Sequence, residues 1–274
     1  MRGFTLVELV VVIALIGVLA AAAGLFIAAP LRGFHDQSRR AALVDAAALA
    51  QQALARDLRA ALPNSVRTNG AALELLLTLD GERYRSDLPG LPEDRLRFDM
   101  ADDGFATFGL LNGGVVPPGA RLAIYPLAQP GADPYRDAVL SAAGSAITLS
   151  PTPVVIGAGR EYRVALNPPH AFAFDSPSHR VFLVQGPVSY FCDLANGRLL
   201  RYAGYGVQPA QPLSLAQLDA LAPAVQVAGK LSACAFGYDP GTAQRNAVVT
   251  AALTLSQDGE DVRLLRQVHV ENSP

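Results

Sequence analysis

A carboxylate stands at the edge of a long apolar run near the start of the chain. Glu8 is the single charged residue between Arg2 and Arg32, and the 21 residues from Leu9 to Ala29 carry no charge. An ionised side chain at the boundary of an apolar helix costs free energy unless it has a partner. Glu8 is therefore a candidate for pairing with a cation of another molecule.

A helix-capping role is the second interpretation of Glu8. Thr5 and Glu8 have the three-residue spacing of a capping box, in which a hydroxyl and a carboxylate satisfy free backbone amides at the start of a helix. Capping uses the chain itself, whereas pairing needs a second molecule. The two roles are compatible and both remain open at this point.

Other side chains that could do chemistry are not arranged for it. The four histidines lack the spacing of metal ligands. No serine lies in a nucleophile elbow, and the glycine pairs lack the pattern of a phosphate-binding loop. Three aspartates near Gly104 lack the spacing of an EF-hand: Asp99, Asp102 and Asp103. We predict no catalytic residue, no metal and no cofactor, and expect that the protein is not an enzyme.

The two cysteines, Cys192 and Cys234, lie far from the apolar run. An isolated pair in an exported domain is typical of one disulfide, and two unrelated buried thiols are the alternative. Strand alternation places both on apolar faces, beside Val188, Tyr190, Phe236 and Tyr238. A disulfide between them would close a loop of about 41 residues and stabilise the fold by roughly 3–4 kcal/mol.

Composition and charge limit the function classes. Apolar residues make up 51% and charged residues 17% of the 274, and the net charge is −2. The chain has no polybasic block, so it lacks the positive surface that binding to nucleic-acid phosphates requires. The adjacent Arg39 and Arg40 are interpreted as part of a solvated helix face. We expect no nucleic-acid partner.

The apolar run predicts a transmembrane helix over residues 4–30. About 20 residues span a bilayer core, and this run is longer than the apolar region of a removable signal peptide. Arg2 and the N-terminal amine precede it, and positive charge stays on the cytoplasmic side. The rest of the chain is therefore expected outside the cytoplasm.

The string Gly3-Phe4-Thr5-Leu6-Val7-Glu8-Leu9 resembles the class III signal of type IV pilins and of type II secretion pseudopilins. The resemblance implies a leader of residues 1–3, cleavage between Gly3 and Phe4 by a prepilin peptidase, and N-methylation of Phe4. It also implies that Glu8 of one subunit pairs with the Phe4 amine of a neighbour and so sets the axial register of a filament. The leader is shorter than is usual in that family.

Helical periodicity continues past the membrane segment, over residues 31–62. Pro30 and Gly33 predict a kink at its start, and Leu62-Pro63-Asn64-Ser65 predicts its end. Apolar side chains recur at steps of three and four: Leu43, Ala47, Ala50, Leu54, Leu58 and Ala61. We expect this stripe to pack on a β-sheet of the same chain, with a coiled-coil partner as the alternative.

Residues 63–274 predict a β-rich head. Turn signals are Gln185-Gly186-Pro187, Asn196-Gly197, Asp239-Pro240-Gly241 and Asp258-Gly259. Ser214 to Leu221 predicts a short helix with a capping box, and residues 100–160 give no clear pattern. The fold class is therefore α+β, and the resemblance implies the type IV pilin-like form, a long N-terminal helix packed on an antiparallel β-sheet head.

A second resemblance covers most of the chain. Residues 58–67, 181–190 and 264–274 are similar to the O-protein family of minor-pilin-like subunits in the mannose-sensitive haemagglutinin (MSHA) pilus biogenesis system. It implies a subunit for initiation or tip assembly of a bacterial type IV pilus, held in the inner membrane with its head in the periplasm and later at the cell surface. The implied partners are other pilin-like subunits, the prepilin peptidase and methyltransferase, and the pilus assembly platform. A type II secretion pseudopilin and a filament-displayed adhesin head are the alternatives.

Overall fold

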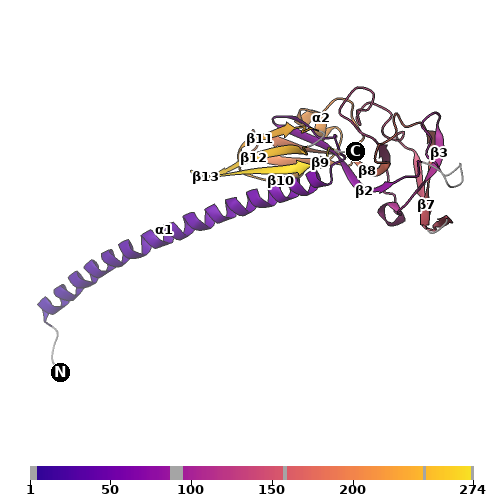
Figure 1. Ribbon diagram of the computed structural model, residues 1–274. Helices are drawn as coiled ribbons and strands as arrows, with labels where there is room; N and C mark the ends of the chain where they lie inside the picture. The colour runs from indigo at the N-terminus through magenta and orange to yellow at the C-terminus, as the bar shows by residue number, and fades with distance from the viewer. Residues whose placement is uncertain (1–4, 87–94, 157–158, 243–244, 273–274) are drawn as a thin grey trace.

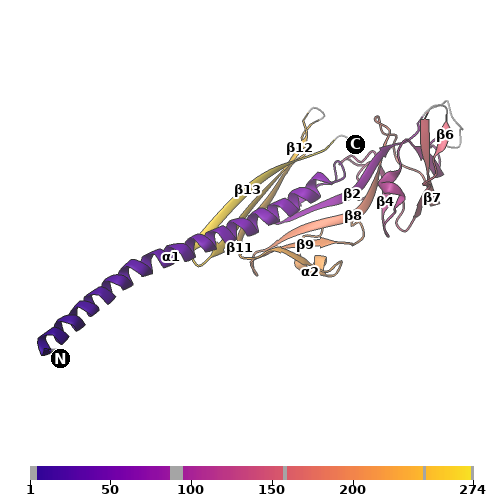
Figure 2. The same cartoon turned by 90° about the horizontal axis from the view of Figure 1, so that it is seen from below.

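A computed structural model describes residues 5–86, 95–156, 159–242 and 245–272. It has an N-terminal apolar helix and a β-rich head, so the α+β class is confirmed (Figure 1). Helix α1, Leu6–Arg59, has 54 residues and is about 80 Å long. It continues through Pro30 and Gly33 without a break and curves smoothly in both views (Figure 2), so a smooth bend stands in place of the predicted kink.

Helix α1 ends earlier than the predicted Leu62. The chain joins the sheet before Pro63 is reached, because the Leu62 amide donates to the Leu76 carbonyl at 2.8 Å. The Thr78 amide likewise donates to the Ala60 carbonyl at 2.7 Å. Pairing with a neighbouring strand therefore ends the helix, before Pro63 could do so.

The second half of α1 buries the predicted stripe. All six of its members, Leu43 to Ala61, are buried, and Leu54 is 1% exposed. They share a core with side chains from strands on both sides of the helix. Gln51 lies in this contact and donates from Nε2 to the Ala251 carbonyl at 3.1 Å. The stripe thus packs on sheets of the same chain, as expected.

The strands form three sheets in which every pair is antiparallel. The first has the order β1-β2-β8-β9-β10, with β4 also on β8; the second is β11-β12-β13; the third is β3-β7-β5, with β6 also on β7. Their bounds are β1 Arg67–Asn69, β2 Ala72–Arg83, β3 Asp102–Thr107, β4 Arg121–Ile124, β5 Ala146–Leu149, β6 Val154–Ile156, β7 Gly159–His170, β8 Arg180–Asp193, β9 Arg198–Ala203, β10 Val225–Ala228, β11 Leu231–Asp239, β12 Ala247–Gln257 and β13 Glu260–Val270.

The first two sheets form a trough that α1 fills. They meet where β11 approaches β1, and the Phe236 amide donates to the Gly70 carbonyl at 2.7 Å. Helix α1 contacts β12 and β13 in one sheet and β10 in the other. Figure 2 shows β12 and β13 on one side of the helix and β9 with helix α2, Leu215–Asp219, on the other.

A second lobe lies at the end of the molecule opposite the N-terminus (Figure 1). It contains β3, β5, β6 and β7, the short 3-10 helix η2 (Leu111–Gly114), and the far parts of β2 and β8. Tyr84, Phe105 and Leu122 lie in its own buried core. Long strands β2 and β8 therefore run through both lobes and join them.

Turn chemistry predicted two hairpins and failed at a third site. Asn196-Gly197 connects β8 to β9 and Asp258-Gly259 connects β12 to β13, so both predictions are confirmed. Gln185-Gly186-Pro187, however, lies inside the continuous strand β8. Leu77 pairs with Gly186 and Thr78 with Val184, which leaves Gln185 as the extra residue of a β-bulge. Gly186 has φ 133°, a conformation that favours glycine.

Candidate functional site

The first turn of α1 carries the Thr5 half of the predicted capping box, in which the Thr5 hydroxyl binds a free backbone amide. The Glu8 amide donates to Thr5 Oγ1 at 3.3 Å, and Thr5 is the N-cap. The Glu8 carboxylate has no hydrogen-bond or ion-pair partner within residues 5–272 as far as these are described. It is exposed and free to meet another molecule. Gly3 and Phe4 lie outside the described residues.

The helix that follows has no protein around it. Leu6, Val7, Leu9 and Val10 point to different sides of the helix, and their exposed fractions are 79%, 70%, 54% and 57%. The stretch Leu6–Ala23 is long and apolar enough to cross a membrane, and no part of it is buried in the head. An apolar helix exposed on all sides needs lipid or other helices around it.

Residues 1–24 match the prokaryotic N-terminal methylation motif. This match gives the chain a type IV prepilin-like N-terminus, and with the exposed apolar helix it indicates membrane anchoring. The motif also indicates a structural subunit that assembles with other pilins after processing by a prepilin peptidase. Comparisons with curated proteins and with solved structures found no match.

Asp57 joins the stalk part of α1 to the first sheet. Its Oδ2 accepts from Tyr190 Oη and from Arg201 Nε, both at 2.7 Å. Burial and the neighbouring Asp57 carboxylate raise the pKa of Tyr190 well above its ordinary value, so the hydroxyl stays protonated and donates. Asp57 lies outside the apolar stripe of the helix, and the sequence did not indicate this contact because β8 and β9 are distant in the sequence.

The turn between β12 and β13 contacts α1 closer to the membrane segment. Arg39 pairs with Asp258 at 3.1 Å and Arg40 with Glu260 at 3.1 Å. The interpretation of these arginines as a solvated helix face is therefore incomplete, since both bind the head. These contacts mark where α1 first meets the head.

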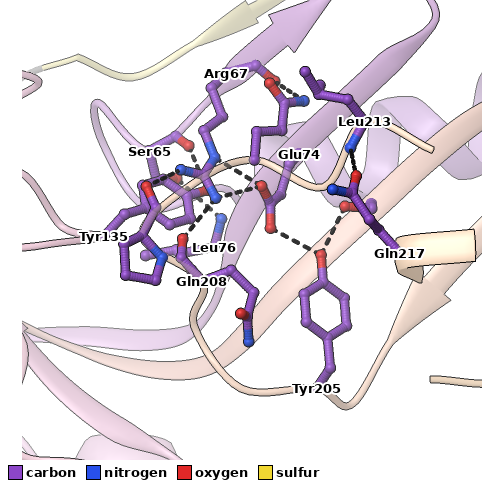
Figure 3. Close-up of polar contacts among 12 residues, drawn as sticks. Ser65, Arg67, Glu74, Leu76, Tyr135, Tyr205, Gln208, Leu213 and Gln217 are labelled. Atoms are coloured by element: carbon purple, nitrogen blue, oxygen red, sulfur yellow. Dashed lines mark hydrogen bonds and ion pairs between the residues drawn. The ribbon is translucent and has the colours of Figure 1, made fainter. Parts of the chain in front are cut away.

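A buried polar cluster surrounds Glu74, which is 0% exposed (Figure 3). Arg67 donates to its Oε2 from Nε at 2.7 Å, and Tyr205 donates to Oε1 at 2.9 Å. Burial raises the pKa of Glu74, and Arg67 and Tyr205 offset part of that effect. The Arg67 guanidinium also lies 3.6 Å from the centre of the Tyr135 ring.

The same arginine fastens a segment without regular structure, residues 204–214, which we call the strap. Arg67 Nη2 donates to the Gln208 carbonyl at 2.8 Å and Nη1 to the Pro209 carbonyl at 3.1 Å. The cluster thus ties the strap to the β1–β2 hairpin. No spacing in the sequence indicated it, because its members are brought together from four separate segments.

Cys192 in β8 and Cys234 in β11 are joined by a disulfide, with a Cα–Cα distance of 6.0 Å. The bond connects the two sheets of the trough. In the described part of the chain, no three His, Cys, Asp or Glu side chains are grouped so as to hold a metal ion. Asp102 instead accepts from the Arg97 amide at 2.8 Å and from the Gly104 amide at 3.2 Å. These two hydrogen bonds stabilise the loop that contains Asp102.

Proposed function

We propose that this chain is a minor pilin-like subunit that acts in the initiating complex or at the tip of a type IV pilus. The observation that carries the proposal is the methylation motif followed by an apolar helix without any protein covering. Such a helix needs lipid before assembly and other helices after it. The similarity of residues 58–67, 181–190 and 264–274 to the O protein of the MSHA system supports the assignment to that kind of pilus.

The processing steps are part of the proposal. A prepilin peptidase cuts between Gly3 and Phe4, and the new Phe4 amine is methylated and keeps its positive charge. The Glu8 carboxylate of one subunit then pairs with the Phe4 amine of its neighbour. The exposure of Glu8 in the first turn of α1 supports this role, because a neighbouring helix can reach it.

The proposed topology follows from the same helix. Residues 4–30 span the inner membrane once, residues 31–59 form the stalk, and the chain from residue 60 onward forms the head in the periplasm. An exported head agrees with the cysteine pair, since disulfides persist in oxidising compartments. The assembly platform is the expected partner at the membrane.

The shape of the head favours a minor role over a shaft role. A shaft subunit packs its head beside many identical heads, and a small regular head suits that position. Here the second lobe extends past the end of α1, and the head has long connections such as residues 125–145 (Figure 1). We infer that the filament tip, where neighbours are missing on one side, accommodates it better.

Two alternative functions are compatible with the same N-terminal motif. A pseudopilin of a type II secretion system would be encoded beside secretion genes, whereas a pilus subunit would be encoded beside pilin genes. A filament-displayed adhesin would bind cell-surface ligands through the isolated head. These two observations separate the alternatives from the proposal.

Copy number tests the minor role directly. We expect quantitative mass spectrometry of sheared filaments to find this chain at a few copies per filament, and deletion of its gene to abolish filament initiation. A finding that this chain is the most abundant subunit would make it a major pilin and contradict the assignment.

A further inference from the structure

Asparagine is followed by glycine at three places in this chain: Asn69-Gly70, Asn112-Gly113 and Asn196-Gly197. In such a pair the glycine backbone nitrogen can attack the carbon of the asparagine side-chain amide, because glycine has no side chain to hinder the approach and adopts many backbone conformations. The reaction needs a free side-chain amide and a glycine N–H that no other group binds. The surroundings of each pair in the fold therefore decide whether it reacts.

Both reacting groups of the Asn196 pair, in the turn between β8 and β9, are engaged. Asn196 Nδ2 donates to Asp193 Oδ1 at 3.0 Å and to Oδ2 at 2.9 Å. The Gly197 amide donates to the Leu194 carbonyl at 3.3 Å. Hydrogen bonds to an ionised carboxylate are stronger than those between neutral groups. Reaction at Asn196 therefore requires that these bonds break first.

The Asn112 pair, in η2, is held at one of its two reacting groups. Asn112 Nδ2 donates to the Val115 carbonyl at 2.8 Å. The Gly113 amide has no acceptor in the part of the chain that the structure describes. We therefore expect Asn112 to react more readily than an asparagine whose amide and following glycine are both bound.

The Asn69 pair, at the end of β1, is free at both groups. Asn69 and Gly70 are exposed, and neither the Asn69 side chain nor the Gly70 amide has a hydrogen-bond partner among the described residues. Gly70 has φ 55°, and no atom outside its chain neighbours lies within 4 Å of the position that a Cβ would take. The side-chain amide and the glycine nitrogen are thus open to one another and to water.

This turn also lies at the contact between the first two sheets. The Gly70 carbonyl accepts from the Phe236 amide at 2.7 Å, and the Ala71 carbonyl accepts from the Cys192 amide at 2.9 Å. Phe236 is in β11 and Cys192 is in β8, the two strands that the disulfide connects. A change in the backbone at Asn69 therefore acts on the contact between the sheets.

We propose that Asn69 is a site of spontaneous deamidation and that the reaction loosens the contact between the two sheets. The Gly70 nitrogen loses its proton to a base in the solvent and forms a bond to Cγ of Asn69, and ammonia leaves. Water then opens the resulting cyclic succinimide at either carbonyl and gives aspartate or isoaspartate, with no oxidation or reduction.

Isoaspartate adds a methylene group to the backbone directly before Gly70. The Gly70 and Ala71 carbonyls then cannot both keep their present positions against the Phe236 and Cys192 amides. The inference does not depend on the proposed function, since it uses only the chemistry and the surroundings of this turn.

Peptide mapping by mass spectrometry tests the site. The purified full chain in detergent is incubated at mildly alkaline pH in heavy-oxygen water, whose label enters when water opens the ring. We expect Asn69 to convert at least about tenfold faster than Asn196, since Asn196 must first break its bonds to Asp193. Asn112 should convert at an intermediate rate.

The reduced chain unfolded in guanidinium chloride is the control. We expect all three asparagines to convert at similar rates there, because each is followed by glycine and the fold no longer protects any of them. Conversion of Asn69 no faster than Asn196 in the folded chain would overturn the assignment. An unchanged order of rates in the unfolded chain would also overturn it, since the sequence and not the fold would then set the rates.

Hydrogen exchange tests the consequence for the sheets. Asn69→Gln is the matched variant, because it keeps the amide but forms the larger ring much more slowly. After incubation we expect the Cys192 and Phe236 amides to exchange faster in wild type and at an unchanged rate in Asn69→Gln. Unchanged exchange in wild type whose Asn69 has fully converted would overturn the loosening of the contact.

Discussion

Glu8 and Glu74 are two carboxylates in opposite surroundings. Glu8 is exposed in the first turn of an apolar helix and has no partner in the described part of the chain. Glu74 is fully buried, and Arg67 and Tyr205 of the same chain bind it. Glu74 therefore acts within the head, whereas the proposed function assigns Glu8 a role between subunits.

Replacing Glu8 by alanine separates assembly from insertion. The variant makes the helix more apolar and removes the inter-subunit charge pair, so we expect normal membrane insertion, normal loss of Met1–Gly3 by intact mass, and little recovery in sheared filaments. Thr5→Ala is the matched control, since it removes the cap at a cost of about 1 kcal/mol without touching the carboxylate. Recovery of Glu8→Ala in filaments at the wild-type level would contradict the charge-pair role of the carboxylate.

The raised pKa of Glu74 predicts a pH dependence of stability. The ordinary value is 4.5, and the folded protein holds the proton more tightly than the unfolded chain does. The contribution of this group is therefore fully present below 4.5 and is lost as the pH rises through the folded pKa. We expect wild type to lose free energy of unfolding relative to Glu74→Gln between pH 4 and pH 7, measured by urea denaturation. Parallel curves for the two proteins would contradict this.

At the scale of elements, the two halves of α1 have different surroundings. Residues 6–23 have no protein contact, whereas the stripe from Leu43 to Ala61 fills the trough. Arg39 and Arg40 mark the boundary through their contacts with the β12–β13 turn. Among the described side chains, the head therefore contacts the second half of the helix and leaves Leu6–Ala23 uncovered.

Two leucines of α1 provide a matched test of this packing. Leu54 is 1% and Leu49 is 65% exposed on the same helix. We expect Leu54→Ala to lower the free energy of unfolding of the detergent-solubilised protein by about 2–5 kcal/mol, because it leaves a cavity. Leu49→Ala should change it by less than about 1 kcal/mol. Equal effects would show that the stripe is not buried in solution.

At the scale of the whole molecule, two sheets and one helix depend on one another. The sheets touch through β1 and β11, the helix fills the space between them, and the disulfide bridges β8 and β11. The second lobe is carried by the extensions of β2 and β8 and has a core of its own. Loosening the contact between the two sheets should therefore free α1 from the head before the second lobe unfolds.

The disulfide supplies the corresponding prediction. Alkylation of the denatured exported protein without reductant should label neither Cys192 nor Cys234. Reduction should lower the free energy of unfolding by roughly 3–4 kcal/mol, because it frees a loop of about 41 residues in the unfolded chain. A Cys192→Ala/Cys234→Ala variant should not respond to reductant. Labelling of both cysteines in the untreated protein would contradict the bond.

Several features of this protein follow from residues close together in the sequence. The apolar run, the Thr5 cap, the stripe of α1 and the hairpins at Asn196-Gly197 and Asp258-Gly259 are all of this kind. Each depends on spacing or turn geometry within a few residues, so local patterns suffice to predict it. The N-terminal motif is likewise a continuous string, and it carried the functional assignment.

The tertiary structure decided what distant segments do together. Pairing with Leu76 ended α1 before Pro63, and the bulge at Gln185 kept β8 continuous where a turn signal stood. The burial of Glu74 with Arg67 and the partial exposure of residues 203–229 are also properties of packing. Composition shows that the latter segment is poor in charged residues, but such a segment is equally suited to a core. The structure buries Tyr205 and Leu218 of this segment against β9 and leaves Leu213 exposed, because only one side of the strap and α2 packs on the sheet.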